Sequence, residues 1–379
     1  MKQWIVALML ALVSSHALAT PANQDWQHVK QDAKGQTVYF NAWGGSQEIN
    51  AYLRWAGREL KREYGVTLKH VKVADIAETV NRLLAEKTAG KETGGSVDMV
   101  WINGENFKSM KYNDLLHGPF VETLPNWQIV DKNLPVTEDF TVPTEGLEAP
   151  WGMGQLVFIH DQNTLATPPR SFTELLQLAK AHPGRVSYPK PPQFHGTSFL
   201  KAALLELTNN RQALYQPVDA ADFEAITAPL WAYLDDLNSV AWRQGEQFPS
   251  SSAETMQLLD DGELLIAITF NPNAAKTAIV TGTLAESARA FAFKQGALTN
   301  AHFLAIPKNA NAKAGAKVAI NFLMSKKAQL RKADTDIWGD PPVVTLPDTA
   351  TTRRFQSQPE PHPSWQTALE SAWLKRYGQ

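Results

Sequence analysis

The chain has 379 residues, and its 36 Lys and Arg nearly balance its 38 Asp and Glu, which gives a formal net charge of -2. Because the basic residues are scattered among acids, no basic surface for nucleic acid is expected. The absence of cysteine excludes disulfides, thiolate metal sites and a cysteine nucleophile. The length exceeds the size at which one hydrophobic core stops growing, so two domains are expected.

The N-terminus has the pattern of a secretory signal peptide. A lysine at position 2 precedes an apolar stretch over 4–13, and residues 17–19 read Ala-Leu-Ala, after which a signal peptidase cuts. A membrane anchor is the alternative, but about ten apolar residues are half of what a spanning helix needs. We therefore predict that residues 1–19 are a removed signal peptide and that the mature chain starts at Thr20. No cysteine follows for lipid attachment, so a periplasmic location is expected.

The next segment alternates between strand and helix patterns. Strands are predicted at 37–42, 66–73 and 97–102, and helices at 46–64 and 75–90. Ser46 is a typical N-cap for the first helix, Gly65 ends it, and Asp75 caps the second helix. This βαβαβ order predicts a parallel sheet flanked by helices, in which ligands bind at the carboxyl ends of the strands. The loops at 43–46 and 103–106 are therefore candidate binding segments.

The rest of the chain continues this alternation between proline-rich connections. The predicted segments are an irregular region at 116–150, an apolar strand at 151–159, a helix at 171–181, a short strand at 186–188, a helix starting near Thr197 and a strand at 264–270. The strand at 151–159 is expected to carry the chain from one domain to the other. The strand at 264–270 places Asn271 and Asn273 at its end.

Three segments carry a resemblance to a known family. They read SFTELLQLAKAHPGRVSYP, GELLIAITFNPN and GALTNAHFLAIPKNANAKAGAKVAINFLMSKKAQL. In this order they resemble the type II periplasmic solute-binding proteins of ABC importers, which include receptors for maltose, polyamines, ferric ion and thiamine. More narrowly, the sequence is similar to the YnjB-type group of binding proteins. The resemblance spans almost the entire chain after the predicted leader.

The resemblance implies an α/β, two-lobed periplasmic-binding-protein type II fold, with mostly parallel sheets flanked by helices and with hinge crossings. The implied lobes are 25–149 together with 301–332, and 151–296. A C-terminal tail at 333–379 would pack across both lobes. The segment at 291–303 would be a second crossing, followed by a helix that packs back on the first lobe.

Such a fold implies a receptor that closes by hinge bending around a small ligand and delivers it to an inner-membrane ABC permease and its ATPase. A monomer without cofactor, metal or catalytic residues is expected. The alternative is a periplasmic enzyme, a hydrolase or transferase, that uses the interlobe cleft, with Asp98 and Glu105 as ordinary acid–base candidates. The Gly-x-Ser-x-Gly, P-loop and GxGxxG motifs are missing, which disfavours it. A scaffold or chaperone would require an exposed apolar face.

Twelve residues, most of them on predicted strand-end loops, are candidate ligand contacts: Trp43, Ser46, Asn103, Glu105, Trp151, Gln155, His195, Thr197, Asn271, Asn273, Trp338 and Asp340. The tryptophans lie next to glycines and can stack on a ligand, with packing as the alternative. The two hydroxyl residues mark helix starts that can receive an anion, or they simply cap those helices. The amide residues can bind a ligand or form turns.

The two acids suggest the ligand class. Glu105 and Asp340 beside aromatic rings favour a cation through ion pairing and cation–π attraction, with plain surface charge as the alternative. His195, within FHGTS, is a candidate metal ligand, but a partnered or solvent-facing histidine is favoured because no paired histidine spacing accompanies it. The expected ligand has a cationic or aromatic part and a polar or anionic end, thiamine being one example. A neutral sugar that stacks on the tryptophans is the alternative ligand.

Overall fold

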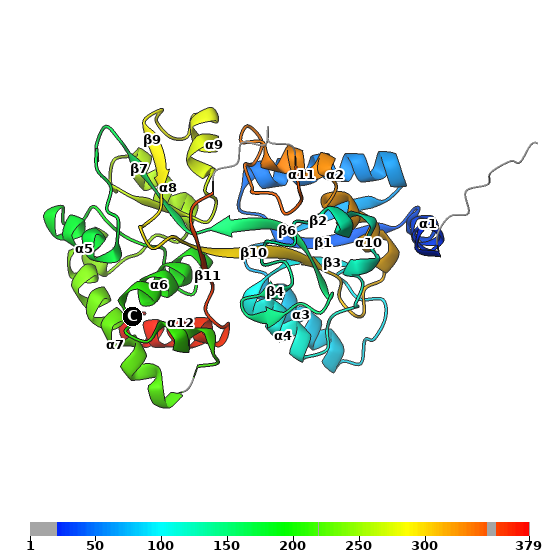
Figure 1. Ribbon diagram of the computed structural model, residues 1–379, viewed down its shortest axis with the longest axis horizontal. Helices are drawn as coiled ribbons and strands as arrows, with labels where there is room; N and C mark the ends of the chain where they lie inside the picture. Colours follow the sequence, from blue (N-terminus) through cyan, green and yellow to red (C-terminus); the bar gives the residue numbers. More distant parts are fainter. Residues whose placement is uncertain (1–20, 219, 347–353, 379) are drawn as a thin grey trace, which may run out of the picture.

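The computed structural model describes residues 21–218, 220–346 and 354–378, in which the chain forms two lobes (Figure 1). The predicted signal peptide and its cleavage site lie outside the described residues. Three segments of the chain pass from one lobe to the other, and each contributes a strand to one shared sheet. The two-lobed α/β fold expected from the sequence is thereby confirmed.

The first lobe is built on a mixed six-stranded sheet. Its strands are β1 (Thr37–Trp43), β2 (Thr67–Val73), β3 (Met99–Ile102), β6 (Glu148–Gln155), β10 (Ala297–Ala305) and β11 (Ser357–Pro359). β1 pairs in parallel with β2 and β3, whereas β10 runs antiparallel to β3 and β6. The parallel part is the βαβαβ unit that the alternation of patterns predicted.

Helices and short elements cover this sheet. The helices are α1 (Pro21–Ala33), α2 (Gln47–Tyr64), α3 (Ala77–Thr88), α4 (Gly104–Tyr112), α10 (Lys313–Leu323) and α11 (Lys326–Ala333). The shorter elements are the 3₁₀ turns η1 (Val121–Thr123) and η2 (Pro125–Ile129) and the strands β4 (Glu138–Asp139) and β5 (Val142–Pro143). α10 packs against α1, α2 and β1, so the late helix does return to the first lobe.

Local sequence signals explain where α2 begins and ends. The Ser46 hydroxyl accepts a hydrogen bond from the backbone N–H of Ile49, and Gly65 adopts a left-handed conformation (φ 69°) just after the last turn. A side-chain N-cap of this kind stabilises a helix by about 1 kcal/mol. Glycine enters the left-handed region without the steric penalty of other residues. Leu53 and Leu60 face the core at the predicted spacing.

The second lobe has a smaller sheet of three strands. These are β7 (Val157–Asp161), β8 (Ala267–Thr269) and β9 (Ala288–Phe291), and β7 pairs antiparallel with both neighbours. Its helical elements are α5 (Phe172–Ala181), α6 (Phe194–Leu207), η3 (Arg211–Tyr215), α7 (Ala220–Val240), η4 (Trp242–Gly245), α8 (Ser252–Asp260), α9 (Ala274–Val280) and α12 (Ser364–Tyr377). The parallel pairing expected from the sequence therefore applies to the first lobe and not to this small sheet.

The predicted strand at 186–188 is wrong. This segment is irregular, although the Val186 carbonyl accepts a hydrogen bond from the backbone of Trp242 and the Arg185 carbonyl accepts one from Leu265. Single hydrogen bonds to two different elements satisfy the buried backbone without forming a strand ladder.

The first crossing is two strands rather than the single strand predicted at 151–159. β6 pairs with β10 in the large sheet, whereas β7 pairs with β8 and β9, and Leu156 separates the two. β10 is the second crossing. The third is the C-terminal segment, in which β11 pairs in parallel with the start of β10 and α12 packs against α6.

Two large hydrophobic cores correspond to the two lobes. One gathers buried residues between Trp26 and Met153 and between Ala301 and Val344. The other gathers residues from Leu156 to Leu298 and is completed by Trp365, Leu369 and Trp373 of α12. Since each core draws on distant parts of the sequence, neither lobe is a continuous stretch of chain.

Gly152 in β6 lies where no side chain fits. A Cβ atom at this position would lie 2.0 Å from both Asp340 Oδ2 and His302 Nε2. We expect Gly152→Ala to lower the free energy of unfolding by about 2 to 3 kcal/mol, as forced overpacking does. Urea or thermal denaturation measures this.

Gly57 in α2 supplies the matched control. A Cβ atom there would lie 3.6 Å from the Leu68 carbonyl, an ordinary contact. Gly57→Ala is therefore expected to stabilise the protein by about 0.5 to 1 kcal/mol, because glycine inside a helix is entropically unfavourable. Equal effects of the two substitutions would contradict the close approach at Gly152.

Candidate functional site

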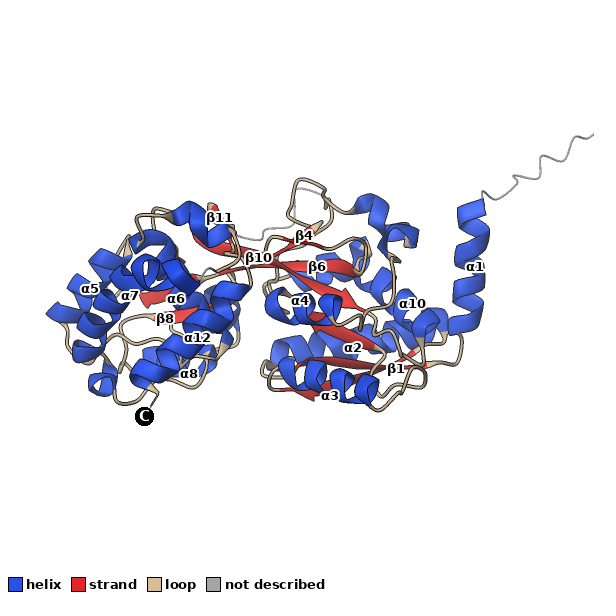
Figure 2. Ribbon diagram, turned by 90° about the horizontal axis from the view of Figure 1, so that it is seen from below, coloured by secondary structure: helices blue, strands red, loops and turns tan. Residues whose placement is uncertain are grey.

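The strand-end loops of the first lobe face helices of the second lobe. Asp75, after β2, lies close enough to Glu370 in α12 to raise the pKa of that carboxyl. Lys108 in α4 lies close enough to His362 to lower the pKa of that imidazole. Figure 2 shows α4 and α12 on the sides of their lobes that face each other. The carboxyl ends of β2 and β3 therefore point toward the other lobe, which is where ligands bind in sheets of this kind.

Trp43 and Ser46 lie at the end of β1. The Trp43 side chain is 37% exposed, and it closes over Gly45, where a Cβ atom would lie 2.4 Å from its ring. The Ser46 hydroxyl caps α2 and also donates a hydrogen bond to Glu48 Oε2 at 2.6 Å. Trp43 thus offers an exposed aromatic surface, whereas Ser46 is already engaged in capping.

Asn103 and Glu105 lie where β3 leads into α4. Asn103 stands at the N-cap position without a side-chain capping bond, and the Gly104 N–H instead donates to Asp139 Oδ2 at 2.5 Å. The Glu105 side chain is 33% exposed, and its Oε2 lies 3.7 Å from Lys108 Nζ without a hydrogen-bond partner among the described residues. Desolvation raises the pKa of Glu105, and Lys108 only partly offsets it. The negative charge of Glu105 is thus only partly compensated by the rest of the protein.

His195 lies in the first turn of α6, which begins at Phe194 and not near Thr197 as predicted. Gln193 is the cap: its Oε1 accepts from the backbone N–H groups of His195 and Gly196, and its Nε2 lies 3.0 Å from His195 Nδ1. Because the amide oxygen is used in capping, the amide nitrogen donates to Nδ1, which assigns the proton of the neutral ring to Nε2. Desolvation lowers the pKa of His195 to about 4. Its partner is thus Gln193, as the favoured sequence interpretation expected.

Thr197 is buried inside α6 and does not cap it. Its hydroxyl donates a 2.8 Å hydrogen bond to Glu370 Oε1 of α12. Desolvation raises the pKa of Glu370, and Thr197 partly offsets this rise. The side chain therefore links two helices of the second lobe.

Asn271 and Asn273 connect the two lobes. Asn271 Nδ2 donates to the Trp338 carbonyl at 3.0 Å, and Asn273 Nδ2 donates to the Gly339 carbonyl at 2.8 Å. The Asn273 N–H in turn donates to Asn271 Oδ1, which forms the turn before α9. These amides bind the C-terminal segment of the chain in this conformation.

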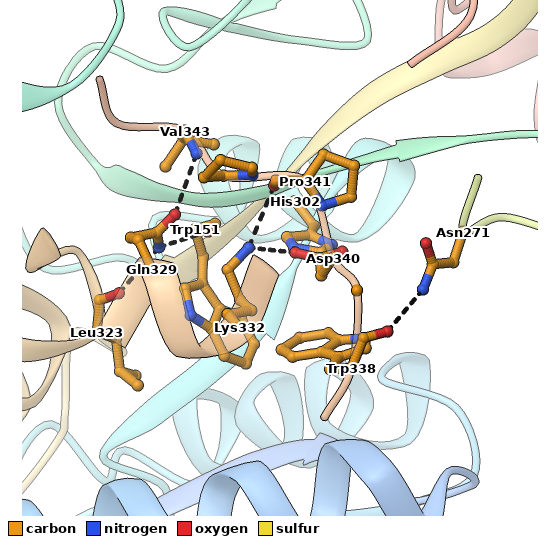
Figure 3. A network of polar contacts seen from close by, with 12 residues as sticks. Trp151, Asn271, His302, Leu323, Gln329, Lys332, Trp338, Asp340, Pro341 and Val343 are labelled. Carbon is orange, nitrogen blue, oxygen red and sulfur yellow. Dashed lines mark hydrogen bonds and ion pairs between the residues drawn. The ribbon is translucent and has the colours of Figure 1, made fainter. Parts of the chain in front are cut away.

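Trp151, Trp338 and Asp340 belong to a buried network of the first lobe (Figure 3). The Trp151 ring is 0% exposed and lies 5.3 Å, centroid to centroid, from the Trp338 ring. Asp340 Oδ2 is paired with Lys332 Nζ and lies 3.1 Å from His302 Nε2. Burial alone would raise the pKa of Asp340, but Lys332 and His302 outweigh it and hold that pKa below its ordinary value. The charge of Asp340 is already compensated, so it has no free carboxylate for a cation.

Gln155 lies at the hinge. Its Nε2 donates to Thr299 Oγ1 and to the Phe355 carbonyl, both at 3.0 Å, and its Oε1 accepts from the Phe355 N–H at 2.8 Å. One side chain therefore ties β6, β10 and the C-terminal segment together. All its amide atoms are used in this way.

Sequence reasoning missed a charged cluster buried between the lobes. Lys201 of α6 pairs with Glu360, which follows β11, and Asp139 of β4 and Glu148 of β6 lie nearby. These residues are too far apart in the sequence for any local motif to link them. The signal that was present is a lysine within the apolar helix segment SFLKAALL.

This arrangement suits binding rather than catalysis. Asp98, an acid–base candidate, accepts backbone N–H bonds from Tyr39, Asn311 and Ala312 and so holds the start of α10. Within the described ranges, no three His, Cys, Asp or Glu side chains converge as a metal ion would require. In the same ranges no helix is both long and apolar enough to cross a membrane.

The fold and the facing loops define a two-lobed binding protein. Residues 55–360 match the family model of the bacterial extracellular solute-binding proteins. The chain is 50% identical over 381 residues to protein YnjB of Escherichia coli (strain K12), with 98% of each chain covered. The chain therefore belongs to the family of bacterial extracellular solute-binding proteins. It is a binding protein, and the enzyme alternative has no support.

Solved structures share this fold at low sequence identity. The spermidine/putrescine ABC transporter substrate-binding protein PotD from Streptococcus pneumoniae matches with a TM-score of 0.59 at 14% identity, over 79% of this chain and 81% of that chain. The apo ferric ion-binding protein A of Pasteurella haemolytica matches with a TM-score of 0.64 at 15% identity, over 89% and 96%. These similarities show the two-lobed type II fold.

The pairing of Lys332 with Asp340 predicts a stability effect. Asp340→Asn is expected to lower the free energy of unfolding by about 3 kcal/mol or more, because it leaves Lys332 buried with an uncompensated charge. The double variant Lys332→Met/Asp340→Asn should recover part of this loss. Denaturant unfolding of the three proteins gives the coupling. A double variant that loses the sum of both single effects would show that the pair is not coupled.

The environment of His195 predicts a pH dependence. The pKa of His195 in the folded protein lies below its unfolded value of 6.5. As the pH falls from 6.5 toward 4, the imidazole is therefore protonated in the unfolded chain before it is protonated in the folded protein. Stability should therefore decrease over this window, and less in His195→Gln, which keeps an acceptor for Gln193. Unfolding curves at pH 6.5 and 4.5 measure the difference. Exposed His28→Gln is the control and should keep the wild-type dependence.

Proposed function

We propose that this protein is a periplasmic receptor that captures a small, positively charged solute between its two lobes and delivers it to an ABC importer. Family membership and the fold support the receptor, and structural relatives with the same fold include an ABC transporter substrate-binding protein. The proposed lobes are 25–149 with 301–332 and 151–296, with the tail at 333–379 crossing both. The two large cores support this division except at Trp151 and Met153, which belong to the first core. An inner-membrane permease with its ATPase would be the partner of the monomeric receptor.

The excess of acidic side chains between the lobes is the observation that favours a cationic ligand. Asp75 on the first lobe lies near Glu370 on the second, and Glu105 of the first lobe has Lys108 as its nearest base. Lobes that bring like charges together close more easily when a cation lies between them. The Glu105 carboxylate, whose side chain is 33% exposed and whose nearest base is Lys108 at 3.7 Å, is the acceptor that we assign to such a cation.

Trp43 supports the aromatic part of this proposal. Its partly exposed ring at the end of β1 can stack on an aromatic ring or attract a charged nitrogen. The proposed anionic end of the ligand has weaker support, because Ser46 and Gln193 already cap the two helix starts with their own side chains. Thiamine, with its cationic ring, is a suitable test compound. An uncharged stacking ligand remains the second candidate.

Glu105→Gln tests the cationic ligand. With thiamine and putrescine as probes, we expect wild-type protein to bind at least one of them and Glu105→Gln to bind it with about 1 to 3 kcal/mol less free energy, the loss when a charged hydrogen-bond partner is removed. Isothermal titration calorimetry measures both affinities.

Glu92→Gln is the matched control, since Glu92 is an exposed acid of the same lobe. It should leave the affinity unchanged. If Glu105→Gln has no effect while Trp43→Ala abolishes binding, the cationic class is wrong and the uncharged stacking ligand is correct.

A further inference from the structure

Three carboxyl groups and one lysine meet in the interior where the lobes join. Asp139 is 1% exposed, Glu148 1%, Glu360 4% and Lys201 1%. Asp139 and Glu148 come from β4 and β6 of the first lobe, Lys201 comes from α6 of the second, and Glu360 lies on the C-terminal crossing. We call these four residues the interlobe charge cluster.

The cluster has more acceptors than donors. Glu360 Oε1 accepts from Asn300 Nδ2 at 2.7 Å, and its Oε2 lies 2.8 Å from Lys201 Nζ. Asp139 Oδ2 accepts from the Gly104 N–H, but Asp139 Oδ1 and both oxygens of Glu148 have no hydrogen-bond partner in the described part of the chain. Such fully buried polar atoms without partners are rare, because each loses its hydration without a replacement.

The charges do not balance either. Lys201 faces Glu360 and Asp139, whereas Glu148 lies beside Asp139 and beside Lys111, whose Nζ already pairs with Glu145. Burial, together with the repulsion between Asp139 and its acidic neighbours, raises the pKa values of Asp139 and Glu148 well above their ordinary range. Burial also raises the pKa of Glu360, against the attraction of Lys201. Ionisation of these acids is therefore disfavoured in this conformation, and a further cation would favour it.

Lys201 itself shows what kind of cation fits. Its Nζ lies 4.5 Å from the centroid of the Phe140 ring and 6.0 Å from that of Phe194. A carboxylate on one side and aromatic faces on the others form the surroundings that bind ammonium groups in proteins. Phe140 belongs to the first lobe and Lys201 to the second, so opening of the lobes would separate the lysine from this ring.

We infer that the interlobe charge cluster is the subsite for the positively charged nitrogen of the ligand, and that Lys201 occupies this subsite while no ligand is bound. This inference rests on the proposed function and adds the position of the charged group. The ligand's ammonium replaces that of Lys201 between Glu360, Asp139 and the Phe140 ring. Lys201 then acts as an internal competitor that lowers affinity and keeps small inorganic cations out.

Substitutions within the cluster should have opposite effects. The probe is n-propylammonium chloride, with 1-propanol as the uncharged analogue and sodium chloride at equal ionic strength. Lys201→Met removes the competitor, so propylammonium should raise its unfolding midpoint by about 2 °C or more, through stabilisation by binding. Wild type should shift less than half as much. Adding Glu360→Gln to Lys201→Met should remove most of the shift, because Glu360 is the carboxylate paired with the Lys201 ammonium.

The control is Lys132→Met, which removes an exposed lysine whose Nζ lies over the Trp127 ring, away from the cluster. Its response to propylammonium should equal that of wild type. Equal shifts in wild type and Lys201→Met, the same shift with propanol, or no shift at all would each overturn the subsite. Because the probe is not the physiological ligand, this result is independent of whether thiamine or putrescine binds.

Glu148→Gln alone gives a second test that does not require Lys201→Met to fold. The folded pKa of Glu148 lies above its unfolded value of 4.5, so wild type loses stability as the pH rises from 4.5 and the buried carboxyl resists ionisation. Glu148→Gln keeps the shape without that penalty and should be at least as stable as wild type at pH 7.5. A marked destabilisation at pH 7.5 would show that Glu148 supports the fold instead, and the inference would be wrong.

Discussion

The pairing of β10 with its neighbours is the constraint on which the whole arrangement depends. One edge of β10 pairs with β6, and the other pairs with β11 at its start and with β3 at its end. Every residue of β6 and β10 is buried, so their backbone groups must remain paired. The two lobes can therefore rotate about these strands but cannot separate. Gln155 lies at the end of β6 and forms hydrogen bonds to the other two crossing segments, so it lies where the backbone would bend in such a rotation.

Two groups of buried charges near this hinge differ in how completely the charges are paired. Around Asp340 the charges are matched, because Lys332 and His302 supply what one carboxylate needs. In the interlobe charge cluster they are not matched, since Lys201 pairs with Glu360 while Asp139 Oδ1 and both oxygens of Glu148 have no hydrogen-bond partner among the described residues. A fully paired network contributes to a unique fold, whereas an unpaired one is maintained at the expense of stability. That contrast distinguishes a structural network from one suited to an incoming cation.

The sequence predicted what depends on local pattern. Ser46 and Gly65 bounded α2 correctly, and the strand patterns located β1, β2 and β3, because caps and periodicity are properties of neighbouring residues. The same reasoning could not separate β6 from β7, since both are apolar and the break at Leu156 follows from pairing with different sheets. Nor could it tell that Trp151 is buried and Trp43 is exposed. Both tryptophans stand beside glycine, and only their distant neighbours differ. Each of Asp340 and Glu105 has a lysine nearby in the sequence, but Asp340 is also paired with His302, which is 38 residues away.

The position of α12 has a consequence for how the chain acquires its structure. Trp365, Leu369 and Trp373 complete the core of the second lobe, although the other residues of that core lie between Leu156 and Leu298. During synthesis, α5, α6 and α7 therefore emerge long before the helix that covers them. Domains usually fold as units in the order in which they leave the ribosome. Here the second lobe has to wait for α12, so its native core cannot form before that helix has been synthesised.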